Sequence, residues 1–120
     1  MVPGRRELIA VFAGGMAGAL ARAGLVEAWP PAPGHWPWVT FAVNVAGALI
    51  IGAGFARYDV GARARWAIGP GFCGALTTFS TMQLELFRMV EVDRVGLALG
   101  YAVASLALGL GAIRVGRALA

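Results

Sequence analysis

Hydrophobic residues dominate four stretches of the chain, and short, more polar segments separate them. The stretches run roughly from Leu8 to Val26, from Trp38 to Phe55, from Arg65 to Val90 and from Val95 to Ile113. Each is close to the length of about 20 residues that a helix needs to cross the hydrocarbon core of a bilayer. The pattern predicts an all-α integral membrane protein with four transmembrane helices, in which residues 1–120 form a single domain.

The composition agrees with this pattern. Of the 120 residues, 59% are hydrophobic and 13% are charged, whereas a soluble domain has about 25% charged residues. The basic residues are all arginines, and most lie at the ends of the stretches, where lipid headgroups explain the net charge of +4 better than nucleic acid does. We therefore expect a multi-pass protein of the cell membrane that contacts the lipid bilayer and binds no nucleic acid.

The segments between the stretches carry little chemistry. The first connection, residues 28–38, is rich in proline and tryptophan, as expected at a membrane interface. His35, the only histidine, has no partner at metal-site spacing there, and we assign it no role. The turn from Arg57 to Arg65 is the most charged part of the chain and is expected to lie outside the lipid. A single cysteine, Cys73, excludes an intrachain disulfide, and no cleavable signal peptide is apparent.

The third stretch contains the most unusual segment of the sequence, Gly71–Met82. Glycine and proline weaken the helical ladder, and hydroxyl side chains can bind the freed backbone groups. The hydroxyl side chains of this segment belong to Thr77, Thr78, Ser80 and Thr81. We expect the third helix to be broken within Gly74–Thr78, about 15 Å from its start and near the midplane. Broken backbone at that depth requires burial or a watery cavity, so the segment predicts an ion or substrate site.

Polar residues of the other stretches leave alternatives open. Asn44, with Thr40 one turn earlier, either makes an interhelical hydrogen bond or presents amide donors to an anion. Tyr101, with Ser105 one turn later, either makes a structural hydrogen bond or lines a pathway. Arg22 lies toward the far end of the first stretch, as a helix-end anchor or as the charge of an electropositive vestibule.

These candidate groups form a neutral polar surface. Its donors are Thr40, Asn44, Ser80, Thr81, Tyr101 and Ser105, with the ring of Phe79 alongside. Neutral donors and the positive edge of an aromatic ring can replace part of the hydration shell of a small anion without trapping it. Glu85 is the one carboxylate that continues the face of Phe79, and we place it near the far end of the third helix because Arg88 follows it.

Three motifs together resemble the Fluc (CrcB) family of fluoride channels. They are the glycines of Gly14–Arg22, the run from Thr40 through Asn44 to Gly47, and the segment Gly71–Met82. The resemblance covers nearly the whole chain in the same order. It implies a passive, fluoride-selective channel that exports fluoride, built as a dimer of oppositely oriented subunits with two pores between them. It also implies a structural sodium ion on the dimer axis.

The resemblance assigns roles to individual positions. Phe79 would present a ring edge to fluoride, and Asn44 would be the pore asparagine. Hydroxyls along the path would come from Thr40, Ser80, Thr81 and, with a looser match, Tyr101. The sodium ion would bind backbone carbonyls of Gly74 and Thr77 from both subunits. One position departs from the family pattern, because Met82 stands where a second phenylalanine is usual. Methionine is flexible and lacks a ring edge, but we expect it to fill the volume and the pore to conduct.

The distribution of arginine leaves the partner open. The side that would hold both termini carries Arg5, Arg6, Arg57, Arg63, Arg65, Arg114 and Arg117, whereas the other side carries Arg22, Arg88 and Arg94. That bias favours one orientation by the positive-inside rule and, together with Met82, allows a heterodimer with a related chain. We favour an antiparallel homodimer.

The sequence leaves three alternatives to a channel. A small four-span multidrug exporter is the main alternative, but it needs a titratable carboxylate deep in its first span, and this first span has none. A non-transporting assembly subunit would leave the hydroxyl cluster after the break unexplained. The sequence shows no nucleophile–base pair and no metal constellation, so an enzyme is the least favoured class.

Overall fold

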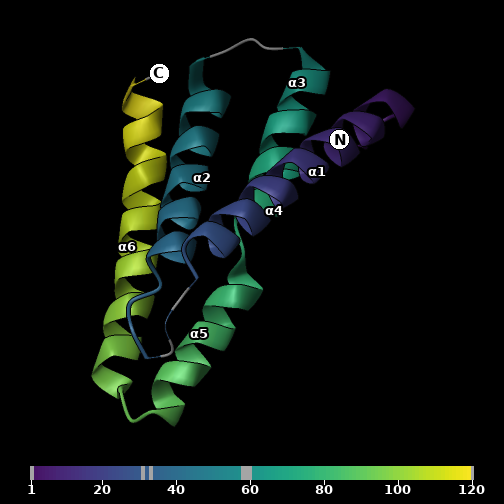
Figure 1. The fold of residues 1–120 in the computed structure, drawn as a ribbon. Helices are drawn as coiled ribbons and strands as arrows, with labels where there is room; N and C mark the ends of the chain where they lie inside the picture. The colour runs from purple at the N-terminus through teal and green to yellow at the C-terminus, as the bar shows by residue number, and fades with distance from the viewer. Residues whose placement is uncertain (1, 31, 33, 58–60, 120) are drawn as a thin grey trace.

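The computed structural model describes residues 2–30, 32, 34–57 and 61–119, and the regular elements in these ranges are all helical. Figure 1 shows their arrangement. The elements are α1 (Arg5–Ala28), α2 (Trp38–Arg57), α3 (Ala62–Trp66), the π-helical η1 (Ala67–Cys73), α4 (Gly74–Leu76), α5 (Phe79–Glu91) and α6 (Val95–Leu119). In Figure 1, α1 and the segment from α3 to α5 run in one direction, and α2 and α6 run in the other.

Two of the described helices, α1 and α6, are long and apolar enough to cross a membrane. Their 24 and 25 residues correspond to lengths of about 36 to 38 Å at helical rise. The apolar part of α2, Trp38–Gly54, is shorter, and the third predicted span is divided into pieces. Few residues of α1 and α6 are buried within the chain, as expected for helices that face lipid or another subunit. The fold is that of an all-helical membrane protein.

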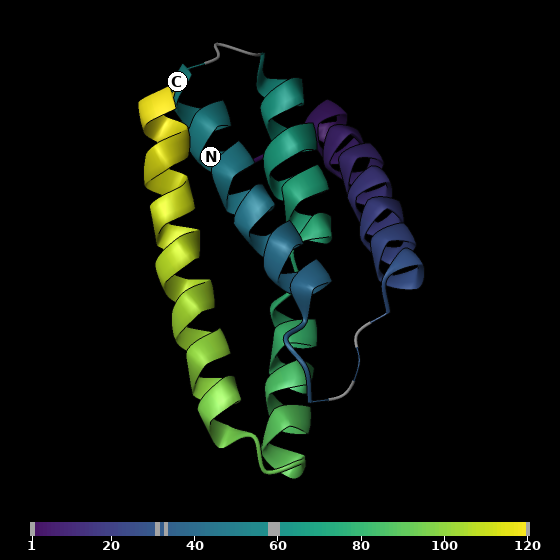
Figure 2. The ribbon, with the colours of Figure 1, turned by 60° about the vertical axis from the view of Figure 1, so that its left-hand side comes forward.

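The third predicted span is interrupted between α4 and α5. Thr77 and Thr78 have extended backbone, with ψ angles of 148° and 111°, and α5 begins at Phe79. Figure 2 shows the two helical parts separated by this extended segment. The predicted interruption within Gly74–Thr78 is therefore present, at the last two of these residues.

The start of the third span was predicted too late. Helix begins at Ala62 rather than at Arg65, so the second half of the predicted charged turn is helical. Residues 58–60 of that turn lie outside the described residues. The wider turns of η1 were not predicted, and they surround Pro70. Proline has no N–H to donate, and π-helical turns are one way in which a helix accommodates such a loss.

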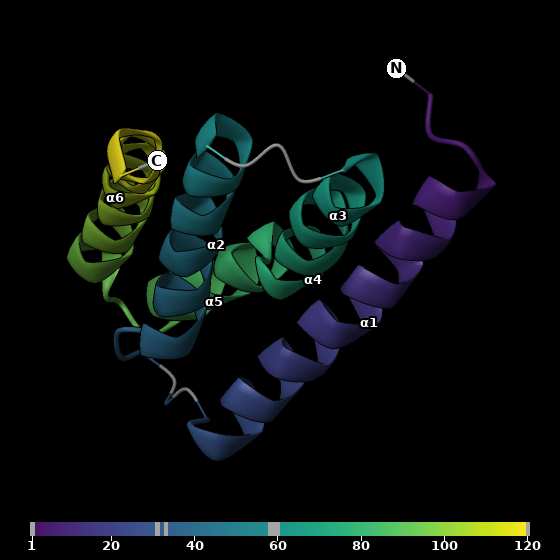
Figure 3. The same cartoon turned by 90° about the horizontal axis from the view of Figure 1, so that it is seen from above.

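Glycines allow the helices to approach closely in two pairs. A Cβ atom at Gly14 or Gly18 of α1 would overlap the backbone carbonyls of Ala67 or Phe72, on the third segment. A Cβ atom at Gly116 of α6 would lie 2.5 Å from the carbonyl oxygen of Leu49 on α2. Small residues at such contacts let membrane helices pack backbone to backbone. Seen from above (Figure 3), α1 and α6 lie on opposite sides of the molecule, with α2 and the α3–α4 segment between them.

A buried cluster joins α5 to the neighbouring part of α6. Its members are Met89, Ala98 and Tyr101, and Trp36, Phe41, Met82, Leu86 and Leu97 pack against it. The ring centroids of Trp36 and Tyr101 are 5.3 Å apart in an edge-to-face arrangement. This packing fixes Tyr101, whose side chain is fully buried, beside α5.

Candidate functional site

A side chain of α2 binds the backbone at the break between α4 and α5. The backbone N–H of Thr78 donates to Oδ1 of Asn44 at 2.9 Å. In an unbroken helix that N–H would donate to the carbonyl of Gly74. Because the oxygen of the amide accepts this bond, the two N–H donors of Asn44 remain for a ligand. The two roles considered for Asn44 are thus compatible. The oxygen of its amide can bind the backbone of Thr78 while the NH2 group donates to an anion.

Thr78 is the N-cap of α5. Its Oγ1 accepts a hydrogen bond from the backbone N–H of Thr81 at 3.1 Å and donates to the Thr81 hydroxyl at 2.9 Å. The hydroxyl of Thr81 therefore accepts this bond and keeps its own proton available. Phe79 and Ser80 follow the cap directly and are exposed, Phe79 by 67% of its surface. The first turn of α5 thus carries free hydroxyls and an open aromatic ring.

Two side chains bind the carbonyls on the other side of the break. Thr77 donates to the Cys73 carbonyl through both its Oγ1 and its backbone N–H, at 2.8 and 3.0 Å. Arg22 of α1 donates from Nε to the carbonyl of Ala75 at 3.1 Å. An unbroken helix would supply that carbonyl with the N–H of Phe79. The half-buried Arg22 thus binds the end of α4, a contact that the sequence did not predict for it.

The carbonyls of Gly74 and Thr77 lose their usual helical donors at the break. The N–H groups of Thr78 and Thr81, which would serve them in a continuous helix, bind Asn44 and the Thr78 hydroxyl instead. Carbonyl oxygens released in this way are suitable ligands for a hard cation. The described residues contain no group of three or more His, Cys, Asp or Glu side chains placed to hold a metal. A cation at the break would therefore rely on backbone oxygens.

A second polar cluster is centred on Glu85 of α5. Thr40 donates to its Oε1 at 2.7 Å, and Tyr101 donates to its Oε2 at 2.8 Å. All three residues are buried, with exposed fractions of 3%, 6% and 0% for Thr40, Glu85 and Tyr101. Each hydroxyl has one proton to donate, and in this arrangement both hydroxyls donate to Glu85. An anion that used Thr40 or Tyr101 as a donor would have to displace the carboxylate.

Glu85 is the site residue that the sequence did not identify. It was placed near the end of its helix because Arg88 follows it, but its carboxylate reaches inward to α2 and α6. The available signal was its spacing, since Glu85 continues the face of Phe79 and Met82. The placement near the far end of the third helix agrees with α5, which ends at Glu91, but the hydrogen bonds of the carboxylate were not predicted.

Met82 and Ser105 do not join either cluster through hydrogen bonds. Met82 packs against the buried group that contains Met89 and Tyr101, and it is much less open than Phe79. The hydroxyl of Ser105 is buried and has no hydrogen-bond partner within the described part of the chain. Phe79 and Met82, three residues apart, thus lie in different surroundings within the single chain.

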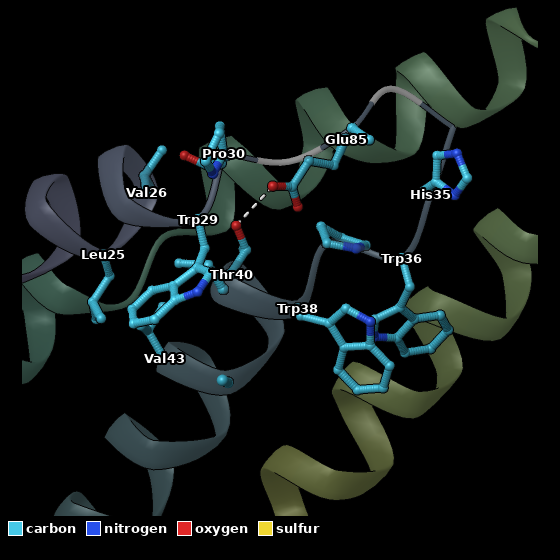
Figure 4. A pocket seen from close by; sticks show the side chains of 15 residues that line it. Leu25, Val26, Trp29, Pro30, His35, Trp36, Trp38, Thr40, Val43 and Glu85 are labelled. Atoms are coloured by element: carbon cyan, nitrogen blue, oxygen red, sulfur yellow. Dashed lines mark hydrogen bonds between the residues drawn. The ribbon is translucent and has the colours of Figure 1, made fainter.

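A cavity of about 750 Å³ connects the two clusters. Thr81, from the cap of α5, and Thr40 and Glu85, from the buried cluster, all line it. Figure 4 shows this cavity and the hydrogen bond between Thr40 and Glu85 at its wall. The indoles of Trp29, Trp36 and Trp38 line it as well. The structure therefore brings together most of the predicted polar residues around the break and this cavity.

Comparisons with known proteins identify relatives along nearly the whole chain. The family described as CrcB-like protein, Camphor Resistance (CrcB), matches residues 9–117. A protein of Mycobacterium bovis named fluoride-specific ion channel FluC 1 is 49% identical over 114 residues, which cover 92% of this chain and 86% of the relative. Proteins named fluoride-specific ion channel FluC from Pseudomonas fluorescens and Bacteroides fragilis are 41% and 34% identical, covering 86% and 92% of this chain and 87% and 93% of the relatives. The relatives are named as ion channels and not as enzymes, in agreement with the sequence. The chain belongs to the CrcB family.

Proposed function

We propose that this protein is a passive, fluoride-selective channel that lets fluoride leave the cell across its membrane. The names of the relatives support the transported ion. The observation that carries the proposal most directly is the hydrogen bond from Thr78 to Asn44, because it leaves neutral amide donors at a break in a membrane helix. Neutral donors bind an anion without a fixed charge that would hold it, and conduction requires release as well as binding.

The proposed path begins at the break and uses groups that still have a donor to offer. Asn44 supplies amide N–H groups, Ser80 and Thr81 supply hydroxyls, and Phe79 supplies a ring edge. Thr40 and Tyr101 would extend the path into the buried cluster. They can donate to fluoride only when their hydroxyl groups no longer donate to Glu85, so an approaching ion competes with the carboxylate.

The channel is proposed to be an antiparallel homodimer with two pores at its interface, each protomer a single domain of four transmembrane helices over residues 1–120. Phe79 and Ser80 support this, because both are exposed in the single chain. A pore lined by these residues needs a second wall, which an inverted copy would supply. If the chain inserted into the membrane in one orientation only, its partner would instead be a related chain, in a heterodimer.

A structural sodium ion is proposed at the dimer axis, held by the carbonyls of Gly74 and Thr77 from both protomers. The redirected N–H groups of Thr78 and Thr81 support this position. Gly74 is also exposed in the single chain, so its backbone is open to a partner. The ion would neutralise the oxygens that the two breaks bring together.

Arg22 and Met82 complete the proposal. Arg22 would contribute positive charge to a vestibule while its Nε remains bound to Ala75. Met82 would replace the second aromatic ring of the family by filling the same volume, and its packing against the Tyr101 cluster supports a space-filling role.

The test is anion efflux from vesicles that contain this chain alone. Vesicles loaded with equal concentrations of potassium fluoride and potassium chloride are diluted into buffer free of both halides, with a potassium ionophore to balance the charge, and ion-selective electrodes follow both ions. The proposal expects rapid fluoride release and chloride release no faster than from protein-free vesicles. Fluoride release at the protein-free rate, or equal release of both ions, would contradict it. Ethidium efflux driven by a proton gradient in the same vesicles would indicate the exporter alternative.

A further inference from the structure

The cavity beside Glu85 has a wall chemistry that fluoride transport does not explain. Three of the four tryptophans of the chain, Trp29, Trp36 and Trp38, line it. In Figure 4 the indole of Trp29 lies on one side of the hydrogen bond between Thr40 and Glu85, and those of Trp36 and Trp38 lie on the other. A volume of about 750 Å³ is far larger than a halide needs. It falls within the range of about 300–1,000 Å³ for sites that bind small organic molecules.

Within the described part of the chain, Arg88 is the cationic group that acts on the carboxylate in this cavity, and it does so without forming an ion pair. Among the described residues, Glu85 makes hydrogen bonds with Thr40 and Tyr101 and forms no ion pair. Arg88, one turn further along α5, is exposed and shares with Glu85 and His35 a separate small cavity. Carboxylates in such buried positions are usually paired, because burial without a counter-charge is costly. The cavity therefore offers an acidic group where a cation would fit.

We propose that this cavity is a binding site for a small aromatic organic cation of the aryl quaternary ammonium class. A quaternary ammonium ion needs no hydrogen-bond acceptor, which suits a carboxylate whose two oxygens already accept bonds from Thr40 and Tyr101. It is attracted to the faces of indole rings and to the negative charge of Glu85. The aryl group fits the apolar, tryptophan-rich wall, whereas a lipid headgroup carries no ring to place there.

The site does not depend on the proposed fluoride channel, and its test reads binding alone. Trp66, on α3, does not line the cavity, so a Trp66→Phe background leaves only cavity indoles to report by fluorescence. The purified chain in nonionic maltoside detergent is titrated with benzyltrimethylammonium chloride, against matched sodium chloride. Its uncharged isostere, neopentylbenzene, is the control for hydrophobic partition. We expect saturable quenching by the cation, with an affinity at least 10-fold higher than for the isostere.

Two substitutions decide the location. Glu85→Gln keeps one acceptor oxygen for the hydroxyls of Thr40 and Tyr101, replaces the other oxygen by an NH2 donor and removes the charge. It should weaken cation binding by about 10-fold or more. Glu91→Gln, at an exposed position of the same helix, should leave binding unchanged. Equal quenching by the cation and the isostere, or equal cation affinity in Glu85→Gln, would overturn the proposal.

A third substitution covers the case in which Glu85→Gln does not fold. Trp29 is 65% exposed at the end of α1, so Trp29→Leu should leave the fold intact. It should weaken binding by about 3-fold or more if the indole contributes a cation–π contact. An unchanged affinity in a folded Trp29→Leu protein, measured with the remaining indoles, would also count against the site.

Discussion

The side chain of Asn44 binds the backbone N–H of Thr78 across two separate segments of the membrane fold, at 2.9 Å. One amide thereby fixes the extended segment between α4 and α5 and keeps its N–H donors directed elsewhere. This arrangement would let a neutral residue be structural and also serve on the anion path that we propose. The hydroxyl of Thr78 also makes two hydrogen bonds, because it accepts from the backbone N–H of Thr81 and donates to the Thr81 hydroxyl.

Arg22 should be needed to keep the end of α4 in place. Replacing it with methionine keeps an unbranched stem but removes the hydrogen bond to the Ala75 carbonyl. Hydrogen bonds to charged groups contribute about 1.5–3 kcal/mol, so Arg22→Met should lower the melting temperature in detergent by several degrees. It should also slow fluoride efflux, because the break would move.

The matched control for Arg22 is Arg114→Met, at an exposed position of α6. It should change neither the melting temperature nor the efflux rate. Arg22→Lys, which keeps the charge and a donor, should recover part of both. An Arg22→Met protein as stable and as active as the unmodified chain would show that the contact with Ala75 is dispensable.

Gly18 should tolerate no side chain. A Cβ atom there would overlap the carbonyl of Phe72, which is backbone and cannot turn away. Gly18→Ala should force α1 away from η1 and destabilise the fold by about 1–3 kcal/mol, as overpacking usually does. Gly24→Ala, on the same helix, meets nothing within 4 Å and should be neutral or slightly stabilising. Thermal unfolding of both variants in one detergent makes the comparison, and similar losses in the two would contradict the packing shown here.

Thr40 and Glu85 should be energetically coupled. Thr40→Val removes one donor of the carboxylate, and Glu85→Gln changes its acceptor. Residues in one buried hydrogen-bond network show coupling energies of about 0.5–3 kcal/mol in a double-mutant cycle. We expect the double variant to be less destabilised than the sum of the single variants. Strictly additive losses in denaturant unfolding would mean that Thr40 stabilises the Glu85→Gln protein as much as it stabilises the carboxylate.

An antiparallel homodimer requires the chain to insert in both directions. A protease-cleavable tag at the C-terminus should therefore be accessible from both faces of the membrane, in comparable amounts, when this chain is expressed alone. Protease protection in right-side-out and inverted vesicles measures this. Cleavage from one face only would instead favour a heterodimer, as the arrangement of arginines along the sequence allows.

Local chemistry made the broken helix predictable. Glycine, proline and clustered hydroxyls in Gly71–Met82 disfavour a continuous helix, and the break occurs where the threonines can bind freed backbone groups. The π-helical turns around Pro70 and the start of helix at Ala62 were not predictable, because they depend on how the third segment packs against α1.

Side-chain partners across helices were the part that sequence could not supply. Arg22 and Ala75 are 53 positions apart, and Thr40 and Glu85 are 45 apart. No spacing rule within one helix relates such residues. The polarity of Thr40 and Tyr101 marked them as candidates, but their shared acceptor became evident only from the way α2, α5 and α6 come together.

Fluoride efflux through an Asn44→Asp variant tests the central claim most directly. Aspartate keeps an oxygen for the N–H of Thr78 and so preserves the break, but it removes the amide donors and adds a negative charge. Like charges brought together cost several kcal/mol, so fluoride efflux should fall by about 100-fold or more while the melting temperature stays close to that of the unmodified chain. A stable Asn44→Asp protein that releases fluoride at the unmodified rate would contradict the claim that the Asn44 amide lies on the path of the ion.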